Sequence, residues 1–178
     1  MRMDETVEQC AVRELKEETS VSDIYVEQLQ AFSGVDRDPR ERVVTVAFLA
    51  FVKQEDYHVV GGDDAAQAQW FPVAETPELA FDHQTILSVA LDKLRWKIAY
   101  EPLAFRLLNS EFTMTQVQTI YEAVLGQKFD RRNFHKKMTA LGYIIPTGNT
   151  SAGSGRPAAL YAFDEAKYRE QVASKNVI

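Results

Sequence analysis

The chain has 178 residues, of which 46% are hydrophobic and 26% charged, a composition typical of a globular protein with one domain or two small ones. Its longest apolar run, residues 43–52, is too short to cross a bilayer, and no basic-then-apolar secretory segment opens the chain, so we expect no membrane partner. The single cysteine has no partner for a disulfide, which is typical of a cytoplasmic protein.

The net charge of −6 is unevenly distributed along the chain. Residues 1–99 hold 10 Lys and Arg against 19 Asp and Glu, whereas residues 100–178 hold 10 against 7. The asymmetry predicts two modules with different partners: an acidic one suited to a metal or small ligand, and a basic one suited to a polyanion.

The first predicted helix begins at Thr6, which has a glutamine three residues later in the spacing of a capping box. Within it, Glu14, Glu17 and Glu18 stand at i, i+3 and i+4 and share one face. These like charges repel unless they are neutralised, either by Arg13 pairing with Glu17 or by a hard divalent cation. The alternative from spacing alone is a solvated acidic helix.

This segment resembles the Nudix box, G-x5-E-x7-R-E-U-x-E-E-x-G-U, in which U is aliphatic. The residues in register with the box are Glu5, Arg13, Glu14, Leu15, Glu17, Glu18 and Val21. Ser20 replaces the second glycine, and the first glycine would precede Met1. The resemblance implies that the glutamates at 14, 17 and 18 bind Mg²⁺ or Mn²⁺, that the metal activates water to attack a nucleoside diphosphate linkage, and that Arg13 orients Glu17.

Several stretches after this helix predict strands. Residues 24–32 are rich in β-branched and aromatic side chains, and residues 42–52 are nearly continuously apolar, which is typical of a strand central in its sheet. Shorter strands are expected at 58–60 and 67–73, the latter ending near a sheet edge at Pro72. The order of elements is similar to the Nudix αβα sandwich.

The loop over residues 33–41 contains the run Asp36-Arg37-Asp38-Pro39-Arg40. It resembles a loop of the ADP-ribose-related Nudix branch, in which an arginine can meet the diphosphate or the terminal ribose. The resemblance therefore implies that Arg37 and Arg40 are ligand-binding residues. The alternative is a solvated turn in which arginine and aspartate pair.

An amphipathic linker helix is expected from residue 83 to residues 96–98, with apolar side chains on one face. We expect the module boundary just after it, which gives a Nudix-like domain over residues 1–99 and a second domain over residues 100–178. The second domain begins with a short helix at 103–108.

Two further helices predict a helix-turn-helix. The first is capped by Thr113 or Thr115 and ends at Gly126, and Asp130 caps the second, which covers residues 131–141.

The second helix has an apolar face, formed by Phe134, Met138 and Leu141, and a basic outer face. Cations for phosphates together with arginine and asparagine for base edges are typical of a recognition helix, although a solvated basic face is the alternative. The candidate DNA-binding residues here are Arg131, Arg132, Asn133, His135, Lys136 and Lys137.

A hairpin follows the helix pair. A strand begins at residues 143–145, a Gly/Ser/Thr-rich loop covers 146–157, and a second strand covers 158–163, so the hairpin has the form of a wing. Arg156, at the base of the loop, can reach the DNA backbone or the minor groove. Residues 164–178 predict a polar terminal helix.

The stretches AFDHQTIL, FDRRNFHKKM and GRPAALYAF make the whole chain similar to NrtR-type regulators, which join a Nudix domain to a C-terminal winged helix. The resemblance implies a homodimeric repressor of NAD metabolism that binds operator DNA and senses ADP-ribose or a related nucleotide. The strands and the Gly-Gly turn that precede the box in this family are missing, so we expect that Met1 is an internal start or that the chain is N-terminally truncated.

Two functions remain open, and they are not exclusive, since a sensor can keep slow turnover. The basic helix and wing favour a DNA-binding repressor, and the complete Arg-Glu-Leu-Lys-Glu-Glu core favours a hydrolase that cleaves ADP-ribose to AMP and ribose 5-phosphate. A repressor is the first hypothesis because a simple hydrolase has little use for the second domain.

Overall fold

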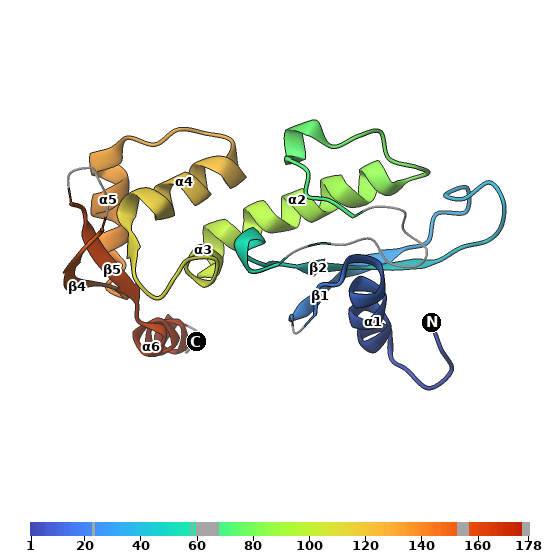
Figure 1. Cartoon of the computed structure of the whole chain (residues 1–178), viewed down its shortest axis with the longest axis horizontal. Helices are drawn as coiled ribbons and strands as arrows, with labels where there is room; N and C mark the ends of the chain where they lie inside the picture. Colours follow the sequence, from blue (N-terminus) through green and yellow to red (C-terminus); the bar gives the residue numbers. More distant parts are fainter. Residues whose placement is uncertain (23, 58, 60–67, 153–156, 176–178) are drawn as a thin grey trace. The chain divides into compact units, whose positions relative to one another are not determined.

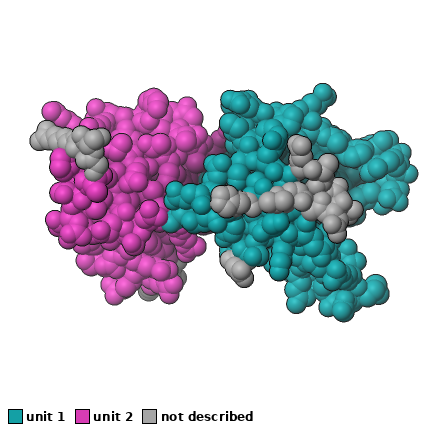
Figure 2. All heavy atoms as spheres, viewed as in Figure 1, with its two compact units in different colours: residues 1–94 teal, residues 95–178 magenta. Residues whose placement is uncertain are grey.

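The structure, a computed structural model, describes residues 1–22, 24–57, 59, 68–152 and 157–175 (Figure 1). In chain order the elements are α1 (Val7–Thr19), β1 (Val26–Phe32), β2 (Thr45–Ala50), the short 3-10 helices η1 (Gln54–Asp56) and η2 (Val73–Glu75), α2 (His83–Tyr100), α3 (Leu103–Arg106), β3 (Phe112–Thr113), α4 (Met114–Leu125), α5 (Arg131–Ala140), β4 (Ile144–Thr150), β5 (Ala159–Phe163) and α6 (Glu165–Lys175). The chain divides into two units, residues 1–94 and residues 95–178, within α2 (Figure 2).

Helix α1 begins as the sequence predicts, with a complete capping box. The Thr6 hydroxyl accepts the Gln9 backbone N–H at 3.3 Å, and the Gln9 side-chain oxygen accepts the Thr6 N–H at 2.8 Å. The helix ends at Ser20, whose φ of 62° lies in the left-handed region that favours glycine. This is the position at which the chain departs from the glycine of the Nudix box.

The sheet of the first unit lies between α1 and α2. Strands β1 and β2 pair antiparallel, with a bulge between Gln28 and Gln30. Val26 lines a cavity together with Leu15 of α1, whereas the next residue, Glu27, pairs with Lys93 of α2 at 3.6 Å. Because successive strand residues point to opposite faces, the two helices cover opposite faces of β1, which confirms the αβα arrangement.

Two strand predictions fail in part. Residues 68–72 form no regular element and Val73 begins η2, so the strand expected at 67–73 is wrong. Pro72 has no N–H to donate to a ladder, and Trp70 and Phe71, which would point to opposite sides of the expected strand, are 43% and 47% exposed. Among the described strands, β2 pairs only with β1, so the expected central position is not observed. The strand expected at 58–60 lies largely outside the described residues.

The second unit is a helix-turn-helix packed on an antiparallel sheet of order β3-β5-β4. Thr113 caps α4 through a second capping box, Gly126 ends it at a φ of 66°, and Asp130 caps α5 by accepting the Asn133 backbone N–H at 2.9 Å. All three boundaries confirm the sequence predictions. The main cluster of buried side chains in this unit consists of Phe105, Phe112, Met114, Val117, Phe134 and Ile144.

Three boundaries in the second half differ from expectation. Helix α2 reaches Tyr100, beyond the predicted end, and the short helix α3 stops at Arg106. Strand β4 extends to Thr150 because its residues still find partners: Thr150 pairs with Ala159, and the Ser151 N–H donates to the Ala158 carbonyl at 2.8 Å.

Among the described residues, none of the helices combines the length and apolar character needed to cross a membrane.

Candidate functional site

Arg13 organises the acidic face of α1. Its guanidinium grips Glu5 with two bonds, from Nε at 2.9 Å and from Nη2 at 2.7 Å. It also contacts Glu14 at 2.7 Å and Glu17 at 2.8 Å. The predicted pairing of Arg13 with Glu17 is confirmed, but the strongest partner, Glu5, was not anticipated, although it stands in register with the box.

The contact between Arg13 and Glu5 has an electrostatic consequence. Hydrogen bonds from Arg13 and from the Arg2 backbone hold the pKa of the Glu5 carboxyl well below its usual range, and Glu5 in turn raises the pKa of Arg13. The Glu5 side chain is only 10% exposed, whereas those of Glu14 and Glu17 are 45% and 52% exposed. The pair therefore anchors the segment before α1 to the helix, and the box glutamates lie half in solvent.

A divalent metal requires more free carboxylate ligands than the acidic face of α1 provides. The oxygen donors of Glu14, Glu17 and Glu18 are of the kind that Mg²⁺ and Mn²⁺ prefer, and the helical spacing puts them on one face. Arg13, however, occupies two of the three carboxylates. Within the part of the chain that the structure describes, no three His, Cys, Asp or Glu side chains come together as a set that could hold an ion. The arrangement as it stands does not fit a bound metal.

The two loop arginines are both paired with aspartates. Arg37 donates from Nε and Nη2 to the two oxygens of Asp82 at 2.9 and 2.8 Å, and from Nη1 to the Thr45 hydroxyl. Arg40 grips Asp38 in the same two-pronged way, at 3.0 and 2.8 Å. The alternative in which arginine and aspartate pair therefore describes the present state of the loop, although Asp82 comes from 45 residues along the chain.

The environments of the two arginines differ. The Arg37 side chain is 6% exposed, whereas that of Arg40 is 70% exposed and lies over the ring of Phe81, 4.7 Å from its centre. Arg40 lowers the pKa of Asp38 to about 2, and Arg37 lowers the pKa of Asp82. Phe81 and Asp82 were not anticipated as members of this site.

Helix α5 presents the predicted basic surface. Phe134 is buried in the core, with Met138 and Leu141 packed against the core beside it, which confirms the apolar face. An open surface concavity of about 420 Å³ is lined by Arg131, Arg132, His135 and Lys136. The exposed polar residues of the helix are Arg131, Arg132, Asn133, Lys136 and Lys137.

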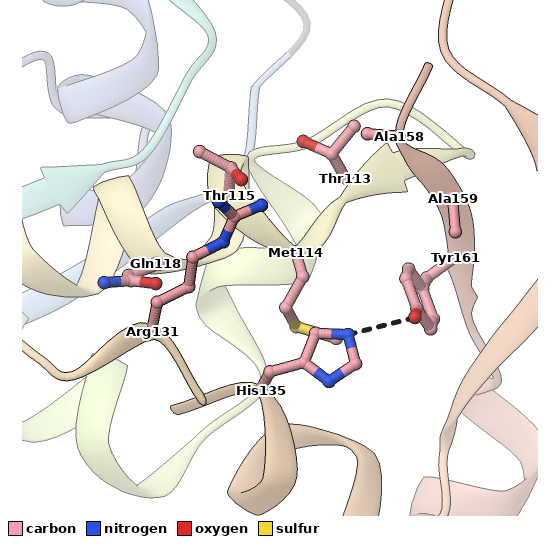
Figure 3. A pocket seen from close by; sticks show the side chains of 9 residues that line it. All are labelled: Thr113, Met114, Thr115, Gln118, Arg131, His135, Ala158, Ala159 and Tyr161. Carbon is pink, nitrogen blue, oxygen red and sulfur yellow. Dashed lines mark hydrogen bonds between the residues drawn. The ribbon is translucent and has the colours of Figure 1, made fainter. Parts of the chain in front are cut away.

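His135 is less available than its neighbours. Its Nε2 lies 3.0 Å from the hydroxyl of Tyr161 on β5, and the two rings meet edge to face (Figure 3). The two side chains line a second, smaller concavity of about 140 Å³, together with the start of α4. His135 thus ties α5 to the wing strand, a partner that lies too far along the chain for sequence spacing to indicate. Arg156 lies outside the described residues.

The two units therefore define the class of protein: a Nudix-type α/β domain followed by a winged-helix domain. Residues 1–90, half of the chain, match the NUDIX domain, so the chain belongs to the NUDIX family. Residues 104–163 match the NrtR DNA-binding winged helix domain. Both matches confirm the fold expected from the sequence.

Named relatives narrow the class. The chain is 31% identical to the ADPR responsive transcriptional repressor NtrR of Acinetobacter baylyi, over 92% of this chain and 66% of the relative. It is 41% identical to the ADP-ribose pyrophosphatase of Methanocaldococcus jannaschii, over 52% of each chain. The crystal structure of Shewanella oneidensis NrtR complexed with a 27mer DNA is similar, with a TM-score of 0.72, 30% identity, and coverage of 90% of this chain and 74% of that one. The chain spans less than two thirds of the length of the first two relatives.

Proposed function

We propose that this chain is a DNA-binding transcriptional repressor whose Nudix domain responds to ADP-ribose or a related nucleotide. The observation that carries the proposal is the exposed basic face of α5, in a unit that matches the NrtR DNA-binding winged helix domain. A simple hydrolase has no use for such a face. The named repressor from Acinetobacter baylyi supports the same assignment.

The DNA contacts divide by chemistry. Lysines and arginines neutralise phosphates, whereas arginine and asparagine side chains can also read base edges in the major groove. His135 holds α5 to the wing through Tyr161, and in this proposal contacts DNA from that fixed position. The proposed DNA-binding residues are Arg131, Arg132, Asn133, His135, Lys136, Lys137 and, in the wing, Arg156.

The effector side of the proposal rests on the first unit. Arg37 and Arg40 are the proposed contacts to the diphosphate of ADP-ribose, and genes of NAD metabolism are the proposed regulon. We expect a cytoplasmic homodimer, because two copies match an operator with two half-sites. If ligand and DNA affect one another, each must change the affinity of the other by the same factor.

The first test is binding of the full chain to promoter DNA of NAD-biosynthesis genes, with and without ADP-ribose, at a stated salt concentration. Specific binding that ADP-ribose weakens is the expected result. A folded chain with no specific DNA binding would overturn the repressor assignment.

A double variant tests the recognition face. Arg132→Ala with Lys136→Ala should weaken DNA binding and lower the slope of log K against log salt by about 2, since each phosphate contact contributes about 0.9. The matched control is Lys167→Ala with Arg169→Ala, two exposed cations of α6. Equal losses in both double variants would reject α5 as the recognition helix.

The second candidate is a metal-dependent hydrolase that cleaves ADP-ribose to AMP and ribose 5-phosphate. The glutamates of the Nudix box on α1 and the identity with an ADP-ribose pyrophosphatase favour it. Mg²⁺ or Mn²⁺ would bind Glu14, Glu17 and Glu18 only after Arg13 releases two of them. Glu17→Gln should abolish Mg²⁺-dependent AMP release and leave DNA affinity unchanged, with Glu8→Gln on the same helix as control. Turnover that survives Glu17→Gln would remove Glu17 from the metal site.

A further inference from the structure

The pair formed by Arg37 and Asp82 joins the arginine loop to the start of a long helix. Nε and Nη2 of Arg37 both donate hydrogen bonds to the Asp82 carboxylate, and Nη1 donates to the Thr45 hydroxyl on β2. The Arg37 side chain is 6% exposed and that of Asp82 is 25% exposed, so water weakens this pair less than an exposed one. An anion that needs Arg37 must therefore compete with Asp82.

Asp82 stands at the start of α2, so its release from Arg37 would affect the first turn of that helix. Its backbone carbonyl accepts the N–H groups of Thr85 at 2.9 Å and Ile86 at 3.2 Å, which are the first bonds of the helix. Its carboxylate also lies at the positive end of the helix dipole, where an acid is stabilising. Helix α2 continues without a break to Tyr100, past the point at which the two units divide.

The residue before Asp82 is conformationally strained. Phe81 has a φ of 53°, in the left-handed region that a bulky side chain rarely occupies. The guanidinium of Arg40 covers its ring, and the ring meets His83 edge to face at 6.0 Å. Two arginines of one loop thus hold the turn that opens α2, Arg37 through Asp82 and Arg40 through Phe81.

We propose that Asp82 is a built-in competitor for the anionic group of the ligand, and that a nucleoside diphosphate binding to Arg37 displaces it and loosens the first turn of α2. The inference rests on the proposed effector function and says how that site is regulated. A diphosphate offers the same paired oxygens as a carboxylate and carries more negative charge, so it can replace Asp82 on the planar guanidinium. The Asp82 carboxylate and the diphosphate cannot both accept the hydrogen bonds from Nε and Nη2 of Arg37 at the same time.

The competition predicts the direction of each change. A ligand must first break the pair, so its apparent affinity is reduced by the fraction of molecules in which Arg37 is free. Removing the carboxylate charge of Asp82 removes that obstacle and should tighten ligand binding about tenfold, since a charge-assisted pair becomes a neutral one. The same change weakens the link between Arg37 and α2, so the factor by which ligand alters DNA affinity should shrink.

The experiment is calorimetric titration of ADP-ribose, and of ADP as a second diphosphate, into the full chain and into Asp82→Asn. Asp38→Asn is the matched control, because it removes one negative charge from the same loop and frees Arg40, whose contact with the turn before α2 is to the ring of Phe81 and not to Asp82. The expected result is a clear gain in affinity for Asp82→Asn that exceeds the gain for Asp38→Asn. Equal gains, or no gain in either, would overturn the proposal.

Hydrogen exchange on the unmodified chain gives an independent readout should Asp82→Asn fail to fold. Saturating ADP-ribose should speed amide exchange at Thr85 and Ile86 and leave the first turn of α4 unchanged. Unaltered exchange at the start of α2, or no binding of either diphosphate, would overturn the proposal that Asp82 competes with the ligand for Arg37. Ligand binding with the expected changes but no operator binding would instead count against the repressor assignment alone, so the two failures are distinguishable.

Discussion

The two units are stabilised by different kinds of contact. Of the buried apolar side chains among the described residues, only Val21 and Phe32 belong to residues 1–94, and the others belong to the second unit. The second unit has a core that includes stacked aromatic rings, in which Phe105 stacks with both Phe112 and Phe163. The first unit has fewer fully buried side chains and carries clusters of paired charges around Arg13 at α1 and around Arg37 and Arg40 in the loop.

The difference suits the proposed roles. A core of close-packed rings has one arrangement and resists change, as a rigid DNA-reading surface requires. Pairs of arginine and carboxylate can exchange partners with a charged ligand, because the anion of the ligand replaces the carboxylate that the arginine releases. The unit that must respond is therefore the one organised by charge, and the unit that must hold its shape is the one organised by apolar packing.

The largest expected effect comes from breaking the aromatic core. Phe112 is 1% exposed, so Phe112→Ala removes a buried ring and leaves a cavity that its neighbours cannot fill. We expect a loss of about 3–5 kcal/mol in the free energy of unfolding of the second unit, measured by chemical denaturation. Tyr25→Ala, at a ring that is 81% exposed, should cost less than about 0.5 kcal/mol. Equal losses would contradict the assignment of the core.

Low pH should destabilise the first unit more than the second, whereas Phe112→Ala destabilises the second. Because the folded-state pKa of Glu5 lies below its unfolded value of about 4.3, its pairing with Arg13 stabilises the first unit fully above that pH and less as the pH falls. Asp38, with a pKa of about 2, acts in the same direction. Residue-resolved NMR from pH 7 to about pH 3 should therefore show the first unit loosening more than the second.

The second unit also contains a charge pair that acid should weaken. Glu122, paired with Lys128, has its pKa lowered to about 2, so this unit also loses some stability in acid. Glu5→Gln should flatten the pH response of the first unit only, and Glu8→Gln on exposed α1 surface should leave it unchanged. A steeper loss in the second unit would show that charge pairing does not dominate the first.

The smallest effect concerns the two matched capping boxes. Thr6→Ala and Thr113→Ala remove the same hydroxyl from the same kind of helix start, and each should cost about 1 kcal/mol. Helix α1, described over its whole length, buries no side chain fully, whereas α4 buries Met114 and Val117. Hydrogen exchange should therefore show fraying throughout α1 in Thr6→Ala but only at the first turn of α4 in Thr113→Ala.

The sequence predicts local features better than distant ones. The caps at Thr6 and Asp130 and the stop at Gly126 were predictable because each signal lies within a few residues of its effect. The failed strand at 67–73 shows the limit of local reading, since apolar residues next to Pro72 form a strand only where a neighbour accepts them.

The candidate site shows the same limit. The arginines were predictable as charged groups in a loop that can pair with its own aspartates, as Arg40 does with Asp38, and the α5 cations as one helix face, but the partners of Arg37 and His135 were not. Asp82 is 45 residues from Arg37, and Tyr161 is 26 residues from His135, so only the folded chain brings each pair together. Glu5 was within reach of sequence reasoning, because it holds a position of the Nudix box eight residues before Arg13.

The hydrogen bond between His135 and Tyr161 has an evolutionary consequence. If α5 contacts DNA as proposed, its exposed side chains can be exchanged one at a time, because nothing else in the described structure depends on Arg132 or Lys136 keeping its identity. Position 135 has no such freedom, since a new side chain there must still meet the wing strand. Among relatives of this protein, residues 135 and 161 should change together, whereas residues 132 and 136, which the proposed function places against DNA, should vary independently of them.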